Sequence, residues 1–212
     1  MQTALAGGRR LQRAQRREQI LAAATEAFAR AGFAGTGLDD VAAEAGVSRV
    51  ILYRHFASKA DLYRSVLERA RRRLAAAAGE GPYTPASVDA LVRAAAEDPA
   101  GFRLLFHHAA REPEFREDID RFRAEVVAVA HRLLADTIPD PAWAAWAARL
   151  TPTVAVEAII AWLDVGQPDR ERVAAMIKEA VAAIVQAARV GTASEPEAVG
   201  PEPGGPPARP RS

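Results

Sequence analysis

The sequence predicts an all-α protein with a small N-terminal domain and a larger C-terminal domain. Of its 212 residues, 50 are alanine, the strongest helix former, and only 6% are aromatic. Apolar residues recur every three or four positions along most of the chain, as expected for helices that bury one face. The sequence contains no cysteine, which excludes disulfides, thiolate metal sites and a cysteine nucleophile.

The first 81 residues are predicted to form an arm, three short helices and a connecting helix. Residues 1–13 contain Gly7, Gly8 and scattered arginines without a sustained period, which predicts a flexible basic arm. A three-helix domain is expected over 14–57, with helices from about residue 14 to Gly32, over 38–45 and over 48–56. Thr36 and Asp39 are expected to cap the second of these helices. The connecting helix is expected within 58–81, starting at a Ser58 cap.

The predicted C-terminal domain covers residues 82–190. Helices are expected over 84–97, 100–111, 113–133, 143–161 and 170–188, the last capped by Asp169. Pro152 is expected to kink or split the fourth of them, because proline lacks an amide hydrogen and disfavours helix at the preceding residue. Residues 191–212 are rich in proline and glycine, which predicts a disordered tail.

The charge of the chain is divided unevenly between its two parts. Residues 1–80 carry a balance of +6 and the remainder −5. A basic N-terminal unit joined to an acidic one suggests that the first part binds a polyanion. No stretch of 18 apolar residues lacks charges, and the basic N-terminus leads into no apolar core. The sequence therefore predicts a cytoplasmic protein with neither a membrane span nor a secretory signal.

The two short helices on either side of Gly46-Val47 predict a helix-turn-helix. Gly46 permits the left-handed backbone of a tight turn, and Val47, Leu52 and Phe56 can pack back on the first helix. The outward side of the second helix then presents Arg49, Val50, Tyr53, Arg54 and His55. Positive charge, a phenol and an apolar tip suit phosphates and base edges in a DNA major groove. Lys59, in the first turn of the next helix, is expected to bind a phosphate.

The stretch from about Arg17 to Leu67 resembles the TetR family of bacterial transcriptional regulators. The string AGVSRVILYRHFASKADLY carries the resemblance: Ala-Gly-Val-Ser, then Leu-Tyr-X-His-Phe, then Ser-Lys-X-X-Leu. The resemblance implies a homodimer in which an N-terminal three-helix domain binds double-stranded DNA at a pseudo-palindromic operator. A larger helical domain would bind a small-molecule effector and dimerise through its last two helices. The residues matched to the DNA-facing surface are Thr36, Arg49, Val50, Tyr53, Arg54, His55 and Lys59.

Two departures from the family pattern concern the operator. Val50-Ile51 stands where the family often has Gly or Pro followed by Thr, Ser or Ala, and Thr36-Gly37 where it often has Thr-Thr. These changes remove hydroxyls that could meet a phosphate or a base. The operator sequence of another family member therefore does not transfer to this chain.

Two further groups of residues have open interpretations. Arg9, Arg10, Arg13, Arg16 and Arg17 fit either a DNA-binding arm or a solvated one. Aromatic residues at helical spacing in the C-terminal domain fit either the core or a ligand cavity. The candidate ligand-binding residues are Phe102, Phe106, His107, Phe122, Trp143 and Trp162.

The predicted function is that of a ligand-responsive transcriptional regulator, a repressor that an effector releases from its operator. The alternative is a DNA-bound structural or interaction protein whose helical domain recruits a protein partner and senses no small molecule. We find no metal-spaced cluster, no phosphate-binding glycine loop and no nucleophile–base pair in the sequence. The sequence therefore predicts no enzyme activity, no metal and no cofactor.

Overall fold

The structure is a computed structural model that describes residues 2–78 and 85–190, and every regular element in these ranges is helical. This confirms the predicted all-α class. The α-helices are α1 (Gln2–Gly35), α2 (Leu38–Glu44), α3 (Arg49–His55), α4 (Lys59–Ala78), α5 (Pro85–Glu97), α6 (Pro99–Arg103), α7 (Arg116–Leu134), α8 (Pro141–Asp164) and α9 (Arg170–Val190). Between α6 and α7 lie a π-helical turn, η1 (Leu104–His108), and two 3₁₀ turns, η2 (Ala109–Arg111) and η3 (Pro113–Phe115).

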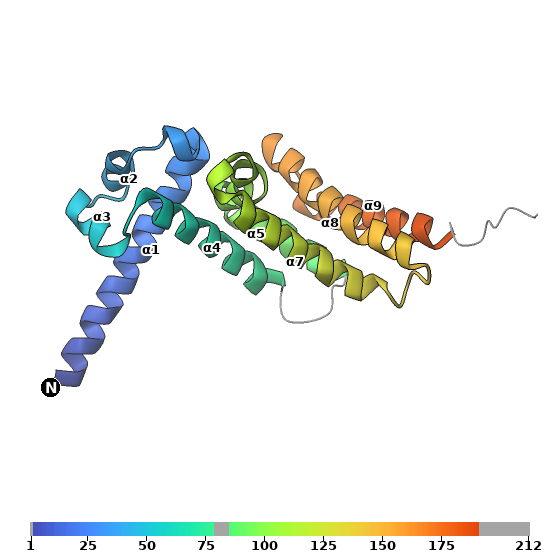
Figure 1. The fold of residues 1–212 in the computed structure, drawn as a ribbon, viewed down its shortest axis with the longest axis horizontal. Coiled ribbons are helices and arrows are strands. Elements are labelled where there is room, and N and C mark those ends of the chain that lie inside the picture. Colours follow the sequence, from blue (N-terminus) through green and yellow to red (C-terminus); the bar gives the residue numbers. More distant parts are fainter. Residues whose placement is uncertain (1, 79–84, 191–212) are drawn as a thin grey trace, which may run out of the picture.

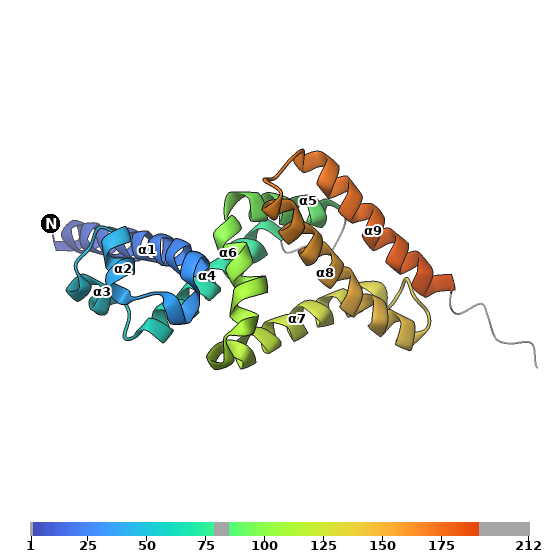
Figure 2. The ribbon, with the colours of Figure 1, turned by 90° about the horizontal axis from the view of Figure 1, so that it is seen from above.

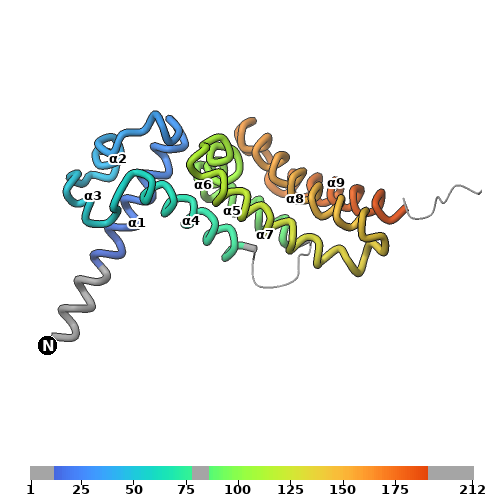
Figure 3. Tube along the Cα trace, viewed as in Figure 1, coloured from blue at the N-terminus to red at the C-terminus, as the bar shows by residue number. Residues whose placement is uncertain are grey.

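The helices follow one another along an elongated molecule. Helices α1, α2 and α3 lie at one end, α8 and α9 pack together at the other, and α4 leads from the first group towards the second (Figures 1 and 2). The Cα trace shows α1 to α4 towards one end and α7, α8 and α9 running back and forth beside one another towards the other (Figure 3). The helix-turn-helix therefore lies at the other end of the molecule from the α8–α9 pair, and the contacts of α1 and α4 with α5, α6 and η1 lie between them.

Two apolar cores meet in the middle of the molecule. The first contains Phe28 and Tyr63 from α1 and α4, but also Phe115 from η3, so the small domain packs directly on the C-terminal one. The second core is formed by α5, α6, α8 and α9. Leu74 and Phe106 pack against both cores. The first core contains residues from both sides of the expected domain limits at 57 and 81. These limits, and the one at 190, therefore stay predictions.

Helix α1 begins at Gln2, so the expectation of a flexible arm over residues 1–13 is wrong for the described part of that segment. The only helix breakers there are Gly7 and Gly8, and each costs about 1 kcal/mol relative to alanine. Extending a helix that is already anchored by packing needs no new nucleus, so two glycines do not stop it. The predicted stop at Gly32 is confirmed as a kink, because its φ of 69° and ψ of 176° leave the helical region before α1 ends at Gly35.

The segment predicted as one helix over 100–111 is divided between α6, η1 and η2. Helix α6 begins earlier, at Pro99, after an Asp98 cap whose carboxylate accepts from the amide of Gly101. The wider π turn places Leu104 and Leu105 in the first core while Phe102 lies in the second. Because this segment packs against two cores at once, it does not continue as a regular α-helix. π turns occur frequently at functional sites.

Pro152 does not split α8, which runs unbroken from Pro141 to Asp164. The hydroxyls of Thr151 and Thr153 donate to the carbonyls of Ala147 and Arg149 at 2.9 and 2.8 Å, which adds hydrogen bonds on both sides of the proline. Helix α8 is also long and apolar enough to cross a membrane by length and composition alone, which the sequence prediction did not foresee. In this fold it packs against α5, α7 and α9, as a core helix does.

Candidate nucleic-acid interface

The turn between α2 and α3 is fixed by backbone hydrogen bonds. Gly46 has φ 62°, and its amide donates to Ala43 O at 3.1 Å while the Val47 amide donates to Ala42 O at 2.9 Å. This is the Schellman arrangement, which satisfies the last carbonyls of α2 and requires a left-handed residue at Gly46. Ser48 then caps α3 by accepting from the amide of Ile51. The local sequence thus sets the angle between the two helices.

The inner side of α3 is buried and its outer side is free. Leu52 and the following Phe56 are almost completely buried, as predicted. Val50 and Tyr53 are 62% and 47% exposed, which is unusual for large apolar or aromatic side chains. Arg54 is also exposed. The predicted recognition surface is therefore available to a partner.

Arg49 is held in place on this surface by two neighbours. Its Nη1 lies 2.9 Å from a carboxylate oxygen of Asp39 in α2, and its Nη2 lies 3.4 Å from the hydroxyl of Tyr53. The guanidinium also lies over the Tyr53 ring, 5.6 Å from its centre. These contacts orient Arg49 at the start of α3 while leaving it accessible to a base or a phosphate.

Lys59 lies in the first turn of α4, as predicted, but its ammonium group contacts α1. It lies 3.4 Å from Ala34 O and 4.6 Å from the centre of the Phe33 ring. Ser58 and Asp61 cap the same helix end: Ser58 accepts from the Asp61 amide and Asp61 from the Ala57 amide. Lys59 is half-buried, but its ammonium group has three donors and the Ala34 carbonyl uses only one of them, so donors remain for a phosphate.

Thr36 does not fit the predicted phosphate contact. It is 3% exposed, and its hydroxyl lies 2.7 Å from Gly32 O and 3.2 Å from Ala27 O. The expected cap by Thr36 and Asp39 is displaced by one position, because the carboxylate of Asp40 accepts from the Gly37 amide at 2.9 Å. The kink at Gly32 frees the carbonyl that Thr36 binds, and this could not be seen in the sequence.

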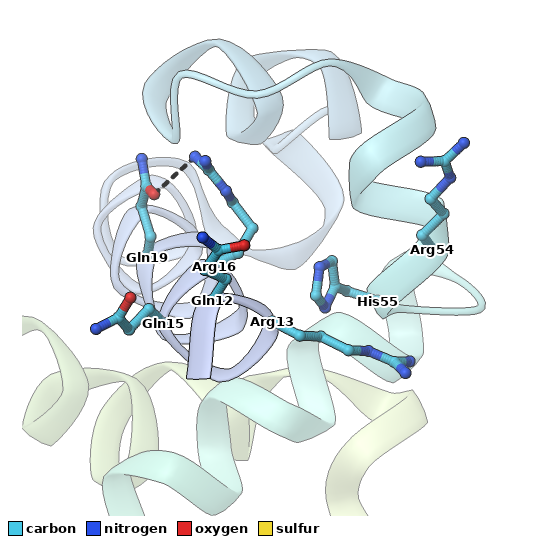
Figure 4. Close-up of a pocket in the computed structure, with 7 residues that line it drawn as sticks. All are labelled: Gln12, Arg13, Gln15, Arg16, Gln19, Arg54 and His55. Carbon is cyan, nitrogen blue, oxygen red and sulfur yellow. Dashed lines mark hydrogen bonds between the residues drawn. The ribbon is translucent and has the colours of Figure 1, made fainter. Parts of the chain in front are cut away.

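His55 lines a concave surface between α1 and the C-terminal end of α3, which encloses an open pocket with a volume of about 860 Å³. Figure 4 shows the residues that line it: Gln12, Arg13, Gln15, Arg16, Gln19, Arg54 and His55. Burial lowers the pKa of His55 below its usual 6.5, and the positive charges of Arg13, Arg17 and Arg16 lower it further. The sequence prediction missed the three glutamines. Gln12, Gln15 and Gln19 are spaced by three and four positions and therefore share one face of α1, which is the signal that could have revealed them.

The candidate ligand-binding residues do not gather into one site. Phe106 lies 4.7 Å from Phe102 and 5.7 Å from Phe122, measured between ring centres, so these three form a continuous row from α6 to α7. Trp162 is buried in the second core, where its indole donates to Pro168 O. Trp143 is 40% exposed near the start of α8. Phe102, Phe106 and Phe122 are therefore the candidates that lie together, and a ligand-binding role for any of the six residues stays a prediction.

The aromatic row borders a void too small for an effector. The cavity beside Phe102 has a volume of about 20 Å³ and is bordered also by Arg73 and Asp98. His107, on η1, is half-buried and its Nε2 lies 2.8 Å from Arg111 Nη2. The row therefore belongs to the apolar cores of the described residues.

Comparisons with known proteins place these features in a family. Residues 20–66 match the model of the bacterial regulatory proteins of the tetR family. The transcriptional activator FasR of Mycolicibacterium smegmatis is 38% identical over 109 residues, which are 48% of this chain and half of FasR. The transcriptional repressor SCO4008 of Streptomyces coelicolor is 32% identical over 133 residues, which are 58% of this chain and 69% of that protein. The chain belongs to the TetR family.

The fold of this TetR-family chain is similar to that of solved structures along most of its length. The regulator FadR of Bacillus subtilis, solved in complex with stearoyl-CoA, has a TM-score of 0.62 at 18% identity. The similarity covers 79% of this chain and 97% of FadR. The predicted architecture, a helix-turn-helix followed by a larger helical domain, is therefore confirmed.

Proposed function

We propose that this TetR-family chain is a DNA-binding transcriptional repressor that reads its operator with the outer surface of α3. The observation that carries the proposal is this surface, where Arg49, Val50, Tyr53 and Arg54 are exposed on a short helix with fixed orientation. A helix of this kind fits a major groove, and arginine can pair with guanine there. Of the relatives that match the sequence, SCO4008 of Streptomyces coelicolor and BepR of Brucella suis are named as repressors.

The repressor acts as a homodimer on a pseudo-palindromic site. Two copies related by two-fold symmetry present two copies of α3 to successive major grooves. Helices α8 and α9 provide the contact, because they pack together at the end of the molecule opposite α3 and expose Trp146 and Met176 to 41% and 59%. The protein works in the cytoplasm, where the DNA is, and catalyses no reaction.

The effector is an apolar small molecule that enters beside the row of Phe102, Phe106 and Phe122. The row lies where the two cores meet, and the interrupted helix of α6 and η1 can rearrange at low cost. The stearoyl-CoA bound to FadR of Bacillus subtilis supports a long acyl chain as the first ligand to test. Such a ligand would favour a conformation in which the two α3 helices no longer match successive grooves.

The proposal is tested with the full chain and the DNA upstream of its own gene. We expect tight binding to an inverted repeat in that DNA, weaker binding to a scrambled duplex, and release by stearoyl-CoA, all measured by fluorescence anisotropy. Equal affinity for the repeat and the scrambled duplex would overturn sequence-specific regulation. Operator binding that stearoyl-CoA leaves unchanged would overturn the acyl-chain effector.

A further inference from the structure

The concave surface between α1 and α3 is lined entirely by groups that can donate hydrogen bonds. Three guanidiniums, three amides and one imidazole face it, and no carboxylate does. The nearby acidic residue of α1, Glu18, points elsewhere, because its carboxylate contacts Arg69 and Arg73 of α4. A surface of this composition suits a phosphate, whose oxygens accept several hydrogen bonds at once.

The arginines of this surface lack the carboxylate partners that several other arginines of the molecule have. Arg30, Arg69 and Arg103 each form an ion pair with a carboxylate. Within the described part of the chain, Arg13 and Arg54 have neither an ion pair nor a hydrogen bond. Arg16 contacts only the neutral side chain of Gln19, at 3.0 Å. Among the residues that the structure describes, no carboxylate pairs with the three positive charges of the concave surface.

The position of the surface determines which anion it can reach. Arg54 belongs both to the exposed side of α3 and to the lining of the concave surface. Figure 4 shows Arg16 on α1 on the other side of His55 from Arg54, while the Arg13 side chain extends from α1 past His55. A duplex that lies on α3 therefore passes the N-terminal turns of α1. The positive charges of Arg13 and Arg16 also help to lower the pKa of His55, in addition to its burial.

We infer that this concave surface binds a phosphate of the DNA backbone beyond the bases that α3 reads, so that α1 is part of the DNA interface. The inference rests on the proposed DNA-binding function. A phosphate carries no sequence information, so the contact strengthens binding to every duplex alike. The contact also assigns Arg13 and Arg16 a role within helix α1, in place of the flexible arm that the sequence suggested.

The test replaces Arg13 and Arg16 with glutamine in one variant, R13Q/R16Q. Glutamine keeps a high helix propensity and removes two positive charges. The matched control is R123Q/R132Q, which removes two exposed positive charges from α7, away from the DNA-binding end. Both variants should fold, since all four side chains are exposed. Their affinities for an operator and for a random-sequence duplex are measured at several salt concentrations.

We expect R13Q/R16Q to weaken binding to both duplexes by the same factor. The slope of log K against log salt should become shallower by about two for a dimer, which is one phosphate per subunit. The control should keep the slope of the unmodified protein. An unchanged slope in R13Q/R16Q would overturn the inference, and so would a loss confined to the operator. If the unmodified protein bound no DNA, the proposed function itself would fail, which is a distinct result.

A second measurement follows His55 directly. In the unmodified protein its NMR titration should shift to higher pH when the random-sequence duplex is added, because a phosphate offsets the charges of Arg13, Arg16 and Arg17. Inorganic phosphate at millimolar concentration is the comparison. A comparable shift with inorganic phosphate, together with an unchanged salt slope in R13Q/R16Q, would show a site for small free anions and overturn the DNA contact.

Discussion

Arg69 of α4 and Asp98, which precedes α6, form an ion pair at 3.2 Å that is largely shielded from water. The side chain of Arg69 is only 7% exposed and that of Asp98 16%. Arg69 also contacts Glu18 of α1 at 2.7 Å, and Arg73 bridges the same two carboxylates. These four charges connect α1 and α4 of the DNA-binding end to the start of α6. If an effector displaced α6, these ion pairs would therefore transmit the movement to α1.

The first prediction is that Asp98→Ala strongly destabilises the protein. It leaves the buried Arg69 with one partner fewer and removes the cap of α6. We expect the free energy of unfolding to fall by about 2–4 kcal/mol, measured by urea denaturation at equal protein concentration. Asp164→Ala is the control, because its pair with Arg103 is 59% exposed on the aspartate side and should contribute less than about 1 kcal/mol. Similar losses for the two variants would show that the shielded network contributes no more than a surface pair.

The second prediction concerns the kink in α1. Gly32→Ala forces a side chain onto a backbone with φ 69°, and should cost about 1–3 kcal/mol. The kink frees the Phe33 amide, which donates to a carboxylate oxygen of Glu112 at 3.1 Å, so the contact between α1 and the C-terminal domain should also weaken. Thermal unfolding compares this variant with Gly35→Ala, which lies three residues on, in the last turn of α1 where alanine fits. Gly35→Ala should be neutral or stabilising, and an equally neutral Gly32→Ala would contradict the strain at the kink.

Local signals in the sequence were sufficient for most helix ends and for the helix-turn-helix. Gly46, Ser48, Asp61 and Asp169 act in the structure as turn or cap residues, because their roles depend on atoms within four positions of them. The buried side of α3 followed from spacing for the same reason. Where an element is stabilised by its own neighbours in sequence, its place can be predicted from the sequence alone.

Features that depend on distant packing could not be predicted in this way. Thr36 is buried because α1 kinks, and the segment after Phe102 changes helix type because it packs against two cores. The last two helices are expected to dimerise, yet Ile177 is 2% exposed within one subunit, because α9 turns that side towards α5 and α8. A helical period shows which residues share a face. It does not show whether that face meets the same chain or a second copy.

The third prediction is a loss of stability in mild acid that comes from two histidines. Burial lowers the pKa of both His55 and His108 below 6.5; nearby arginines add to this in each, and His107 does so at His108. The unfolded chain therefore binds protons that the folded protein does not. The stability that comes from keeping these histidines neutral is complete above about pH 6.5. It is lost as the pH falls through their lowered pKa values.

Replacing both histidines with glutamine should therefore reduce this dependence on pH. Urea unfolding at about pH 7 and about pH 5 measures it, with His131→Gln on the exposed side of α7 as the control. The double variant should lose less stability between the two pH values than the control does. Equal losses would mean that other groups cause the acid sensitivity.

The fourth prediction separates the dimer contact from the fold. Met176→Glu places a charge on the exposed side of α9 and should yield a folded monomer, as measured by light scattering and circular dichroism. Ile177→Glu places the same charge in the second core and should unfold the subunit, because an unpaired buried charge costs several kcal/mol. Val129→Glu, 44% exposed on α7, is the control and should remain a dimer. A dimeric Met176→Glu would place the contact elsewhere.

The fifth prediction distinguishes a phosphate contact from base recognition at the DNA-binding end. Lys59 lies at the start of α4 and should bind a phosphate with the donors that Ala34 O does not use. Lys59→Ala should therefore weaken binding to the operator and to random DNA by the same factor, with a shallower salt slope. Arg49 lies in the first turn of α3, oriented by Asp39 and Tyr53, in the place suited to a base edge.

Arg49→Ala should consequently reduce operator affinity by about 1–3 kcal/mol more than affinity for a scrambled duplex, because a guanine contact distinguishes between sequences. Asp39→Asn supplies the complementary variant. It keeps Arg49 but removes the carboxylate that holds it, so random-sequence affinity should rise while the preference for the operator falls. Anisotropy titrations of the three variants against both duplexes at two salt concentrations measure these effects. If Arg49→Ala and Lys59→Ala reduced operator and scrambled binding in the same proportion, base recognition would not depend on Arg49, and the other exposed residues of α3 would have to account for it.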